Sequence, residues 1–280
     1  MNSSLVNVRV WGDFACFTRP EMKVERVSYP LVTPSAARGI LEAIFWEPQM
    51  YYVLDSVRVV KRGRWVSFRR NEVVSPVSLD NARTWMNAPD KFDPIHAGGG
   101  AADGTQRNML ALEDVEYVLT AEVRLSEVGR NANQELKKYC AEIERRARQG
   151  KCFHRPALGV REFAADFEWF DEAQKIELAK WPEEDLGLML YDVFDSDERA
   201  TGFRWFSDEE MKRSQSARLK DIEQLPKGER KAAAKEPLKR YEGVALKPKA
   251  AFFHAKVENA RMDCHPERVR IIRQNTEGGR

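Results

Sequence analysis

The sequence predicts an α+β fold in which the elements follow the order strand, helix, strand, insertion, strand, helix, strand. Residues 115–125 alternate apolar and polar side chains, which is typical of a half-buried strand. Residues 33–47 and 133–149 carry apolar side chains at helical spacing. This order is the split βαβ plan of ferredoxin-like and RRM-like domains. We therefore expect a ferredoxin-like/RRM-like domain with a basic hairpin insertion and a small C-terminal β appendage.

The first strand is expected at Val6–Val10, where valines alternate with polar residues, and a turn-rich loop follows to Pro30. A helix begins next, because Thr33 suits the N-cap and proline occupies the first helical position. Pro48 ends this helix, and residues 51–60 alternate as a second strand.

The insertion begins with residues 65–77, which we expect to form a basic hairpin arm. Residues 81–106 are predicted to be a loop, since they are polar and contain three consecutive glycines at 98–100. The strand at 115–125 comes next. A helix at 133–149 follows it, with Gly150 placed to end the helix.

Further strands are predicted at 163–170 and 186–194. We expect residues 1–195 to form the main domain and 196–280 the small appendage. Within the appendage, the charged segment 219–249 is expected to be flexible and residues 251–257 to form a last strand. The tail from Glu258 is expected to be poorly ordered.

Composition excludes several classes of protein. The chain is 42% hydrophobic and 32% charged, and none of its apolar runs approaches the length of a membrane span. The N-terminus carries neither a basic stretch nor an apolar signal core, so we expect a cytoplasmic protein with no membrane contact. The four cysteines lack CxxC spacing, which argues against a disulfide framework or a zinc ribbon; we expect no metal and no cofactor.

Charge is unevenly distributed, although the net charge is only +2. Three blocks are basic, at residues 58–70, 130–161 and 211–249, and the block at 162–210 is acidic. A single basic block is usually a solvated helix face. Three blocks, two of them with interleaved aromatic residues, favour a path for a polyanion such as nucleic acid.

Several motifs together resemble the CRISPR-associated Cas-five family of subtype I-C. Their order and spacing cover about the first 190 residues, with weak support from residues 251–253 after that. The motifs are WGDFACFTRPE at 11–21, YP at 29–30, TPSAARGIL at 33–41, IFWEP at 44–48, TQR at 105–107, LGVREF at 158–163 and LGLMLYD at 186–192.

This resemblance implies a metal-independent endoribonuclease that cleaves the repeat hairpin of precursor CRISPR RNA (crRNA). It also implies that the protein remains bound to the crRNA 5′ handle, beside other subunits of a type I-C interference complex. The 2′-OH is the nucleophile in such chemistry, and the products are a cyclic phosphate and a 5′-OH. The protein must remove the 2′ proton, stabilise the phosphorane charge and protonate the leaving oxygen.

The resemblance also implies catalytic positions, and this sequence departs from them. A tyrosine before the tryptophan at the helix end is replaced by Phe45, which has no hydroxyl. A Lys-His pair, counted back from Gly150, becomes Lys138-Tyr139. Lys138 would stabilise the phosphorane as a point charge, or it is only a solvated helix lysine. Tyr139 is a candidate acid or base, and His154, in a basic aromatic loop, is a rival general base.

Cations and aromatic rings inside or beside the motifs are candidate RNA contacts. Arginine forks onto phosphates, and aromatic rings stack on unpaired bases. The polar helix residue Arg38 either faces RNA or extends to the surface. The candidates are Trp11, Phe17, Arg19, Lys23, Arg26, Arg38, Arg107 and Arg161.

Two other functions remain open from the sequence. The departures at Phe45 and Tyr139 also suit a non-catalytic subunit that only holds crRNA. The basic blocks alone would also suit a non-specific DNA-binding protein, whose affinity for unrelated duplex would fall with salt.

Overall fold

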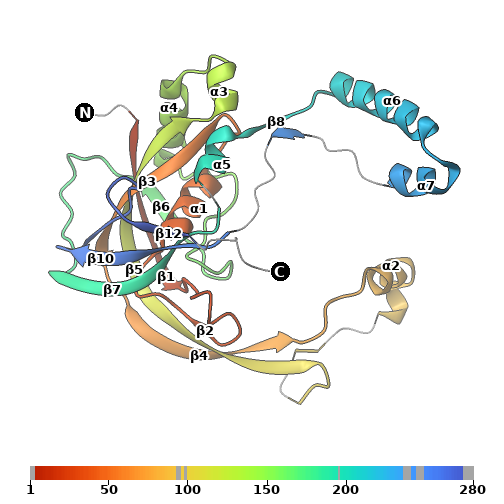
Figure 1. The fold of residues 1–280 in the computed structure, drawn as a ribbon. Helices are drawn as coiled ribbons and strands as arrows, with labels where there is room; N and C mark the ends of the chain where they lie inside the picture. Colours follow the sequence, from red (N-terminus) through yellow and green to blue (C-terminus); the bar gives the residue numbers. More distant parts are fainter. Residues whose placement is uncertain are drawn as a thin grey trace.

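The structure is a computed structural model, and it describes residues 4–92, 96–97, 100–194, 196–235, 241–243 and 249–273. It is a mixed α/β fold built on one large, mainly antiparallel sheet (Figure 1). The sheet has ten strands, and its main path runs β12-β10-β11-β3-β5-β1-β6. Strands β2 and β4 pair with β5, and β7 pairs with β10.

Four strands form the centre of this sheet. They are β1 (Leu5–Ala15), β3 (Met50–Lys61), β5 (Gly104–Leu125) and β6 (Asp166–Trp169). β5 pairs antiparallel with both β1 and β3, and β6 pairs antiparallel with β1. The alternation predicted for the first strand is confirmed, because Val6, Val8 and Val10 are all buried.

Helices α1 (Pro34–Ile44) and α4 (Leu136–Arg148) pack on the central strands and on each other. The predicted start of α1 is confirmed: the Thr33 hydroxyl accepts a hydrogen bond from the N–H of Ala36, with N···O 3.2 Å. The predicted end of α4 is also confirmed, since Gly150 follows it with φ +64°, a left-handed conformation that favours glycine. A short helix, α3 (Glu127–Asn131), links β5 to α4.

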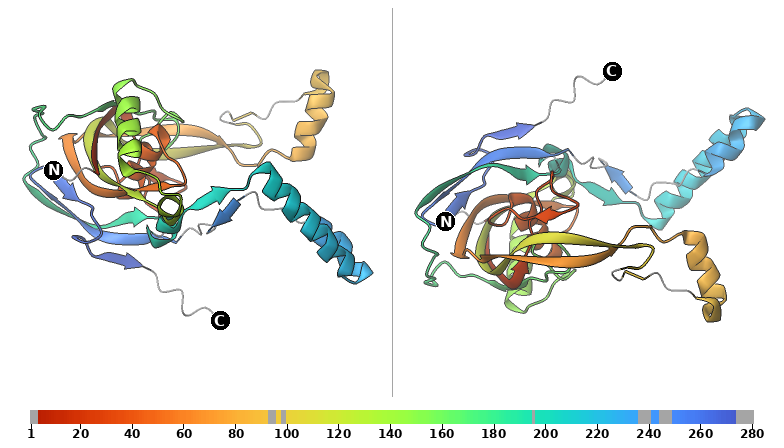
Figure 2. Two further views of the ribbon diagram at one scale, coloured as in Figure 1. Left: turned by 90° about the horizontal axis from the view of Figure 1, so that it is seen from above. Right: turned by 90° about the horizontal axis from the view of Figure 1, so that it is seen from below.

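A two-stranded arm extends from the body (Figures 1 and 2). It consists of β4 (Arg64–Val73) paired with residues 104–113 of β5. The hairpin predicted within 65–77 is therefore only one strand of the arm, because its partner follows after the insertion. The loop expected at 81–106 is only partly a loop. Helix α2 (Leu79–Asn87) and the 3-10 turn η1 (Pro89–Lys91) occupy its start, because Ser78 caps α2 and Trp85 packs edge-on against Phe92, with ring centroids 5.0 Å apart. Of the three glycines, 98 and 99 lie outside the described residues.

The C-terminal strands extend the same sheet. β7 (Glu183–Asp192) and β10 (Ala251–Glu258) form a long antiparallel pair, and β11 (Arg261–Asp263) joins β10 to β3. β12 (Ile271–Arg273) pairs with the start of β10. The tail expected to be poorly ordered therefore contains two strands, because backbone groups of β3 and β10 are available to pair with it.

The chain between β7 and β10 forms a second projection (Figure 2). It contains α5 (Ser196–Thr201), α6 (Asp208–Gln224) and α7 (Lys227–Lys235), and β8 (Phe203–Trp205) pairs with β9 (Tyr241–Gly243). The described part of the segment expected to be flexible, 219–249, is thus largely helical; residues 236–240 and 244–248 lie outside the described residues. A complete capping box at Ser207 and Glu210 supports the start of α6.

The short strand β2 (Arg26–Val27) runs parallel to β5 beside the arm. One core unites the helices and the sheet, with buried residues from α1, α4, β1, β3, β5 and the β7–β10 pair. Across the described ranges, no helix is both long and apolar enough to cross a membrane.

Candidate active site and nucleic-acid interface

The end of helix α1 lies against α4 and brings two of the predicted positions together. Phe45, the C-cap residue of α1, stacks on Tyr139 with ring centroids 6.4 Å and ring planes 25° apart. The Phe45 carbonyl accepts a hydrogen bond from the Tyr52 hydroxyl, with O···O 2.8 Å. This bond fixes the extended turn that ends the helix. Both rings of the stacked pair are buried, so the departed family position Phe45 packs directly on Tyr139.

The Tyr139 hydroxyl donates a hydrogen bond to Oε1 of Gln134, with O···O 3.2 Å. Burial and the nearby Glu47 carboxylate raise the pKa of this phenol above its ordinary value. Tyr139 therefore keeps its proton near neutral pH. A protonated phenol can donate a proton or a hydrogen bond, but it is a poor general base.

Two cations lie beside the stacked rings. Nζ of Lys138 is 5.2 Å from the Tyr139 ring centroid and donates to Oε1 of Gln134, with N···O 3.4 Å. Cζ of Arg146 is 5.2 Å from the Phe45 ring centroid, and its Nε binds Glu142 at 2.7 Å. The side chain of Lys138 is exposed, and no carboxylate of the described chain pairs with it. Lys138 is therefore an exposed positive charge beside the stacked rings.

The loop that carries His154 is attached to the same end of α1. The backbone N–H groups of Phe153 and His154 both donate to the carbonyl of Ala43, each with N···O 2.9 Å. These bonds satisfy a carbonyl group that the helix end leaves free. The His154 ring is exposed and packs edge-on against Phe153, with ring centroids 4.5 Å apart. Lys138 and Tyr139 thus lie beside Phe45, and the backbone of the His154 loop is bonded to the same end of α1.

A second group of predicted residues lies at the base of the arm. Arg70 on β4 is directly opposite Arg107 on β5, and β2 places Arg26 beside the same strand. Arg70 pairs with Glu162 at 2.7 Å. A hydrogen bond from its own backbone and the charges of Arg70 and Arg26 lower the pKa of the Glu162 carboxyl. The exposed Arg161 is its chain neighbour, so this cluster presents several arginines at the arm base.

Arg38 does not face the solvent. Its Nε and Nη2 donate to the two carboxylate oxygens of Asp192 at 2.8 and 2.9 Å, and Nη1 donates to Glu42. Only 8% of Arg38 is exposed. The expected RNA contact is therefore contradicted by the burial of this side chain, and its interruption of the apolar helix face has a structural cause. Arg199 of α5 also pairs with Asp192, at 3.4 Å.

The other predicted RNA contacts differ in their exposure to solvent. Phe17 is buried and packs edge-on against Tyr117, so its ring is not available to a base. Trp11 is half-buried, with the Arg9 guanidinium 5.3 Å from its ring centroid. Arg19 stacks 4.9 Å from the Tyr29 ring and is half-buried, whereas Lys23 is exposed.

Gly159, in the chain between α4 and β6, allows this chain to pass close to the end of β1. Its φ is +91°, and a Cβ at this position would lie 2.0 Å from the carbonyl oxygen of Cys16. The N–H of Cys16 donates to the Leu158 carbonyl, with N···O 2.9 Å. The close approach of the two chain segments requires glycine here. Among the described residues, no three His, Cys, Asp or Glu side chains are grouped as metal ligands.

The sequence model of a family described as CRISPR-associated protein (Cas_Cas5) matches residues 5–261. This match covers most of the chain. The chain belongs to the Cas-five family. The family membership expected from the motifs is therefore confirmed.

Two curated Cas-five relatives are similar over 67% of this chain. A protein of Mannheimia succiniciproducens named "CRISPR pre-crRNA endoribonuclease Cas5d" is 42% identical over 196 residues, which are 84% of its length. A protein of Thermus thermophilus with the same name is 39% identical over 197 residues, which are 72% of its length.

Two solved structures share the fold. A functionally uncharacterized protein from Streptococcus mutans has a TM-score of 0.52 at 19% identity, covering 94% of this chain and 93% of its own. A structure described as a CRISPR-associated protein has a TM-score of 0.51 at 17% identity, covering 92% and 90%. At these identities the likeness concerns the fold alone.

Sequence reasoning missed two residues of this Cas-five protein that lie at the end of α1. Arg146 is seven positions after Tyr139 and therefore lies on the same face of α4, where it reaches Phe45. Gln134 accepts from both Lys138 and Tyr139. The helical spacing from Tyr139 could have indicated Arg146, but no sequence signal indicates Gln134, which precedes the helix.

Proposed function

We propose that this protein is a metal-independent endoribonuclease that cleaves the repeat hairpin of precursor crRNA. The observation that carries the proposal is the grouping of Lys138, Tyr139 and His154 around the end of α1. The two curated relatives, both named pre-crRNA endoribonucleases, support the same substrate. Because precursor crRNA is transcribed in the cytoplasm, we place the activity there.

Each residue of the site suits one part of the reaction. The exposed imidazole of His154 takes the proton from the 2′-OH, whose oxygen attacks the phosphorus. Lys138 stabilises the extra negative charge on the phosphorane. As the P–O5′ bond breaks, Tyr139, which keeps its proton at neutral pH, donates that proton to the 5′ oxygen; the step requires its buried hydroxyl to exchange Gln134 for the RNA. The products are a 2′,3′-cyclic phosphate and a 5′-OH.

The fold supports a finer description of the domain. The strand order β6-β1-β5-β3, with two packed helices in the crossovers, agrees with a ferredoxin-like or RRM-like unit. We assign this unit, residues 1–195, to RNA binding and catalysis. Residues 196–280 are then a β appendage whose strands β10–β12 continue the same sheet.

Retention of the cleaved RNA is the second part of the proposal. The arginines at the arm base, Arg26, Arg107 and Arg161, bind phosphates of the crRNA 5′ handle. The protein then stays in a type I-C interference complex beside other subunits. Lys23 and Arg19 extend this surface, while the buried Arg38 and Phe17 do not contribute to it.

The test is cleavage of a repeat hairpin in EDTA by wild type, Lys138→Ala, Tyr139→Phe and His154→Ala. A positioned proton-transfer group contributes about 10²–10⁴ in rate, so each loss should be easy to measure. Lys138→Ala should lower the single-turnover rate and leave hairpin affinity nearly unchanged, because the phosphorane charge develops only in the transition state. A hairpin with a 2′-deoxy nucleotide at the cleaved bond is the substrate control and should stay intact.

A second candidate function is that of a non-catalytic subunit that only holds crRNA. It is favoured by Phe45, which places a ring without a hydroxyl against Tyr139. Tight hairpin binding without any cyclic-phosphate product would establish this alternative. Equal affinity for unrelated duplex DNA and for repeat RNA would instead favour a non-specific DNA-binding protein.

A further inference from the structure

A cavity of about 550 Å³ lies where β3, β10 and β11 meet the chain that leads into β12. Its volume is within the range of small-ligand sites. Five of its lining residues are cations and two are carboxylates. None of the lining residues belongs to α1, α4 or the His154 loop. Its cations are Arg58, Lys256, Arg261, Arg268 and Arg270.

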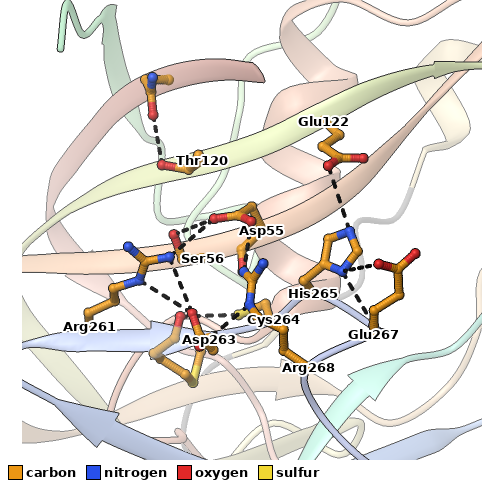
Figure 3. A network of polar contacts seen from close by, with 12 residues as sticks. Asp55, Ser56, Thr120, Glu122, Arg261, Asp263, Cys264, His265, Glu267 and Arg268 are labelled. Atoms are coloured by element: carbon orange, nitrogen blue, oxygen red, sulfur yellow. Dashed lines mark hydrogen bonds and ion pairs between the residues drawn. The ribbon is translucent and has the colours of Figure 1, made fainter. Parts of the chain in front are cut away.

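Two of the arginines are held rigidly by shared carboxylates (Figure 3). Arg268 binds Asp55 at 2.7 Å and Asp263 at 3.5 Å. Arg261 binds the same two carboxylates, each at 3.3 Å. A guanidinium has five N–H donors, and these contacts use only some of them. The remaining donors are therefore oriented in advance for a further acceptor.

The other two arginines lack such partners. In the part of the chain that the structure describes, no carboxylate lies within ion-pair distance of Arg58 or Arg270. Arg58 is half-buried, and its Cζ is 5.0 Å from the ring centroid of Phe170. Burial and the charge of Arg261 lower the pKa of the Arg58 guanidinium. The charged form of Arg58 is therefore held at a cost to the unliganded protein.

Burial is the larger cause of this cost, and the strand register adds to it. Arg58 on β3 is directly opposite Arg261 on β11. Like charges directly opposite one another in an antiparallel pair are destabilising. An anion in the cavity would remove the repulsion between the two arginines.

We propose that this cavity is an anion site, separate from the cleavage site, that binds phosphate groups of single-stranded RNA. Arg58 and Arg270 contribute the unpaired charges, and Arg261 and Arg268 contribute oriented donors. Arginine forks match the geometry of phosphate oxygens. RNA as the source of the phosphate rests on the proposed function, and it places the RNA contact outside the cleaved bond.

The first arm of the test uses inorganic tripolyphosphate and needs no RNA. Tripolyphosphate should raise the melting temperature of wild type and of the control Arg213→Gln, an exposed arginine of α6. It should raise that of Arg58→Gln/Arg270→Gln much less. In phosphate-free buffer Arg58→Gln should melt no lower than wild type, because it removes a like-charge pair. A lower melting temperature with an unchanged tripolyphosphate response would show that Arg58 only packs on Phe170, which overturns the site.

The second arm measures affinity for the uncleavable 2′-deoxy repeat RNA at several salt concentrations. The double variant should bind about tenfold more weakly, as expected for lost hydrogen bonds to a charged group. Its slope of log affinity against log salt should be shallower by about 1.4, or about 0.7 for each lost phosphate contact to single-stranded RNA. Its single-turnover cleavage rate at saturating protein should stay within about twofold of wild type.

The two arms separate this inference from the proposed function. An RNA affinity and salt slope equal to wild type, with a lost tripolyphosphate response, would overturn RNA as the ligand. An unchanged tripolyphosphate response would overturn the site itself. A wild-type protein that fails to cleave repeat RNA contradicts the proposed function, while the tripolyphosphate arm still decides whether the cavity binds phosphate.

Discussion

Replacement of Asp192 by alanine should destabilise the protein more than any surface change. Asp192 is buried and accepts two hydrogen bonds from Arg38, and it also pairs with Arg199. Its Oδ1 further accepts from the backbone N–H of Val193, with N···O 2.7 Å. The substitution leaves two buried guanidinium groups without this carboxylate.

Removal of one partner from a buried ion pair costs about 3–5 kcal/mol. An unfolding entropy of about 2.1 cal/mol/K per residue gives roughly 0.6 kcal/mol/K for this chain, so we expect the melting temperature to fall by about 5–8 °C. The measurement is differential scanning calorimetry. The control is Asp166→Ala, because Asp166 is 64% exposed and its ion pair with Arg155 is 3.9 Å long. Exposed pairs contribute about 0–1 kcal/mol.

A fall of less than about 2 °C, or an equal fall in the Asp166→Ala control, would refute the argument. Such a result would mean that solvent reaches Arg38 and Arg199 once the carboxylate is removed. The restoring experiment is Arg38→Met/Arg199→Met in the Asp192→Leu background, because buried ion pairs can be replaced by apolar side chains with little loss of stability.

Three further predictions follow from the fold and the interface. The charges of Arg38 and Arg199 outweigh burial and lower the pKa of the Asp192 carboxyl in the folded protein. The contribution of Asp192 to stability is therefore complete above its ordinary pKa of about 4 and is lost as pH falls through the lower pKa of the folded state. The urea midpoints of wild type and Asp192→Ala should accordingly converge in acid. Gly159→Ala should cost about 2 kcal/mol or more in urea unfolding, because its φ is +91° and Cys16 blocks the Cβ, whereas Gly228→Ala, which meets no neighbour, should be nearly silent. Replacement of residues 208–235 by a short Gly-Ser linker should leave the melting temperature nearly unchanged, because α6 buries none of its side chains; a large fall would show that this projection packs on the body.

Local signals predicted the central part of the fold well. Thr33 and Pro34 mark the start of α1, and Gly150 marks the end of α4, because caps depend on residues within a few positions. The strand within 115–125 was also found, since neither a helix nor a loop produces strict apolar and polar alternation over so long a segment. These signals need no knowledge of distant residues.

Features that depend on distant partners were not predicted. Arg38 interrupts an apolar helix face, and Asp192, the partner that accounts for its position, follows 154 positions later. Strands β11 and β12 are only three residues each and carry almost no periodicity; their pairing with β3 and β10 determines them. Helix α2 was hidden by a polar, glycine-containing sequence whose cap at Ser78 preceded the predicted loop.

The sequence singled out the residues of the candidate site, but it did not specify their surroundings. Counting from Gly150 placed Lys138 and Tyr139 correctly beside Phe45. A neighbouring cation such as Lys138 would lower the pKa of a phenol, but burial and Glu47 raise the pKa of Tyr139. The direction of this shift depends on solvent access, which the sequence does not specify, and of the two roles left open for Tyr139 it favours the acid over the base.

Strand β5 runs without interruption from the arm to the region of the candidate active site. Its 22 residues span about 70 Å at the usual rise of a strand. β1 pairs with β5 from Leu112 to Glu122 and so braces the junction where β4 gives way to β3. At the far end, Ser126 donates its N–H to Gln49, four residues after Phe45. One continuous strand therefore connects the arm to the segment that ends α1.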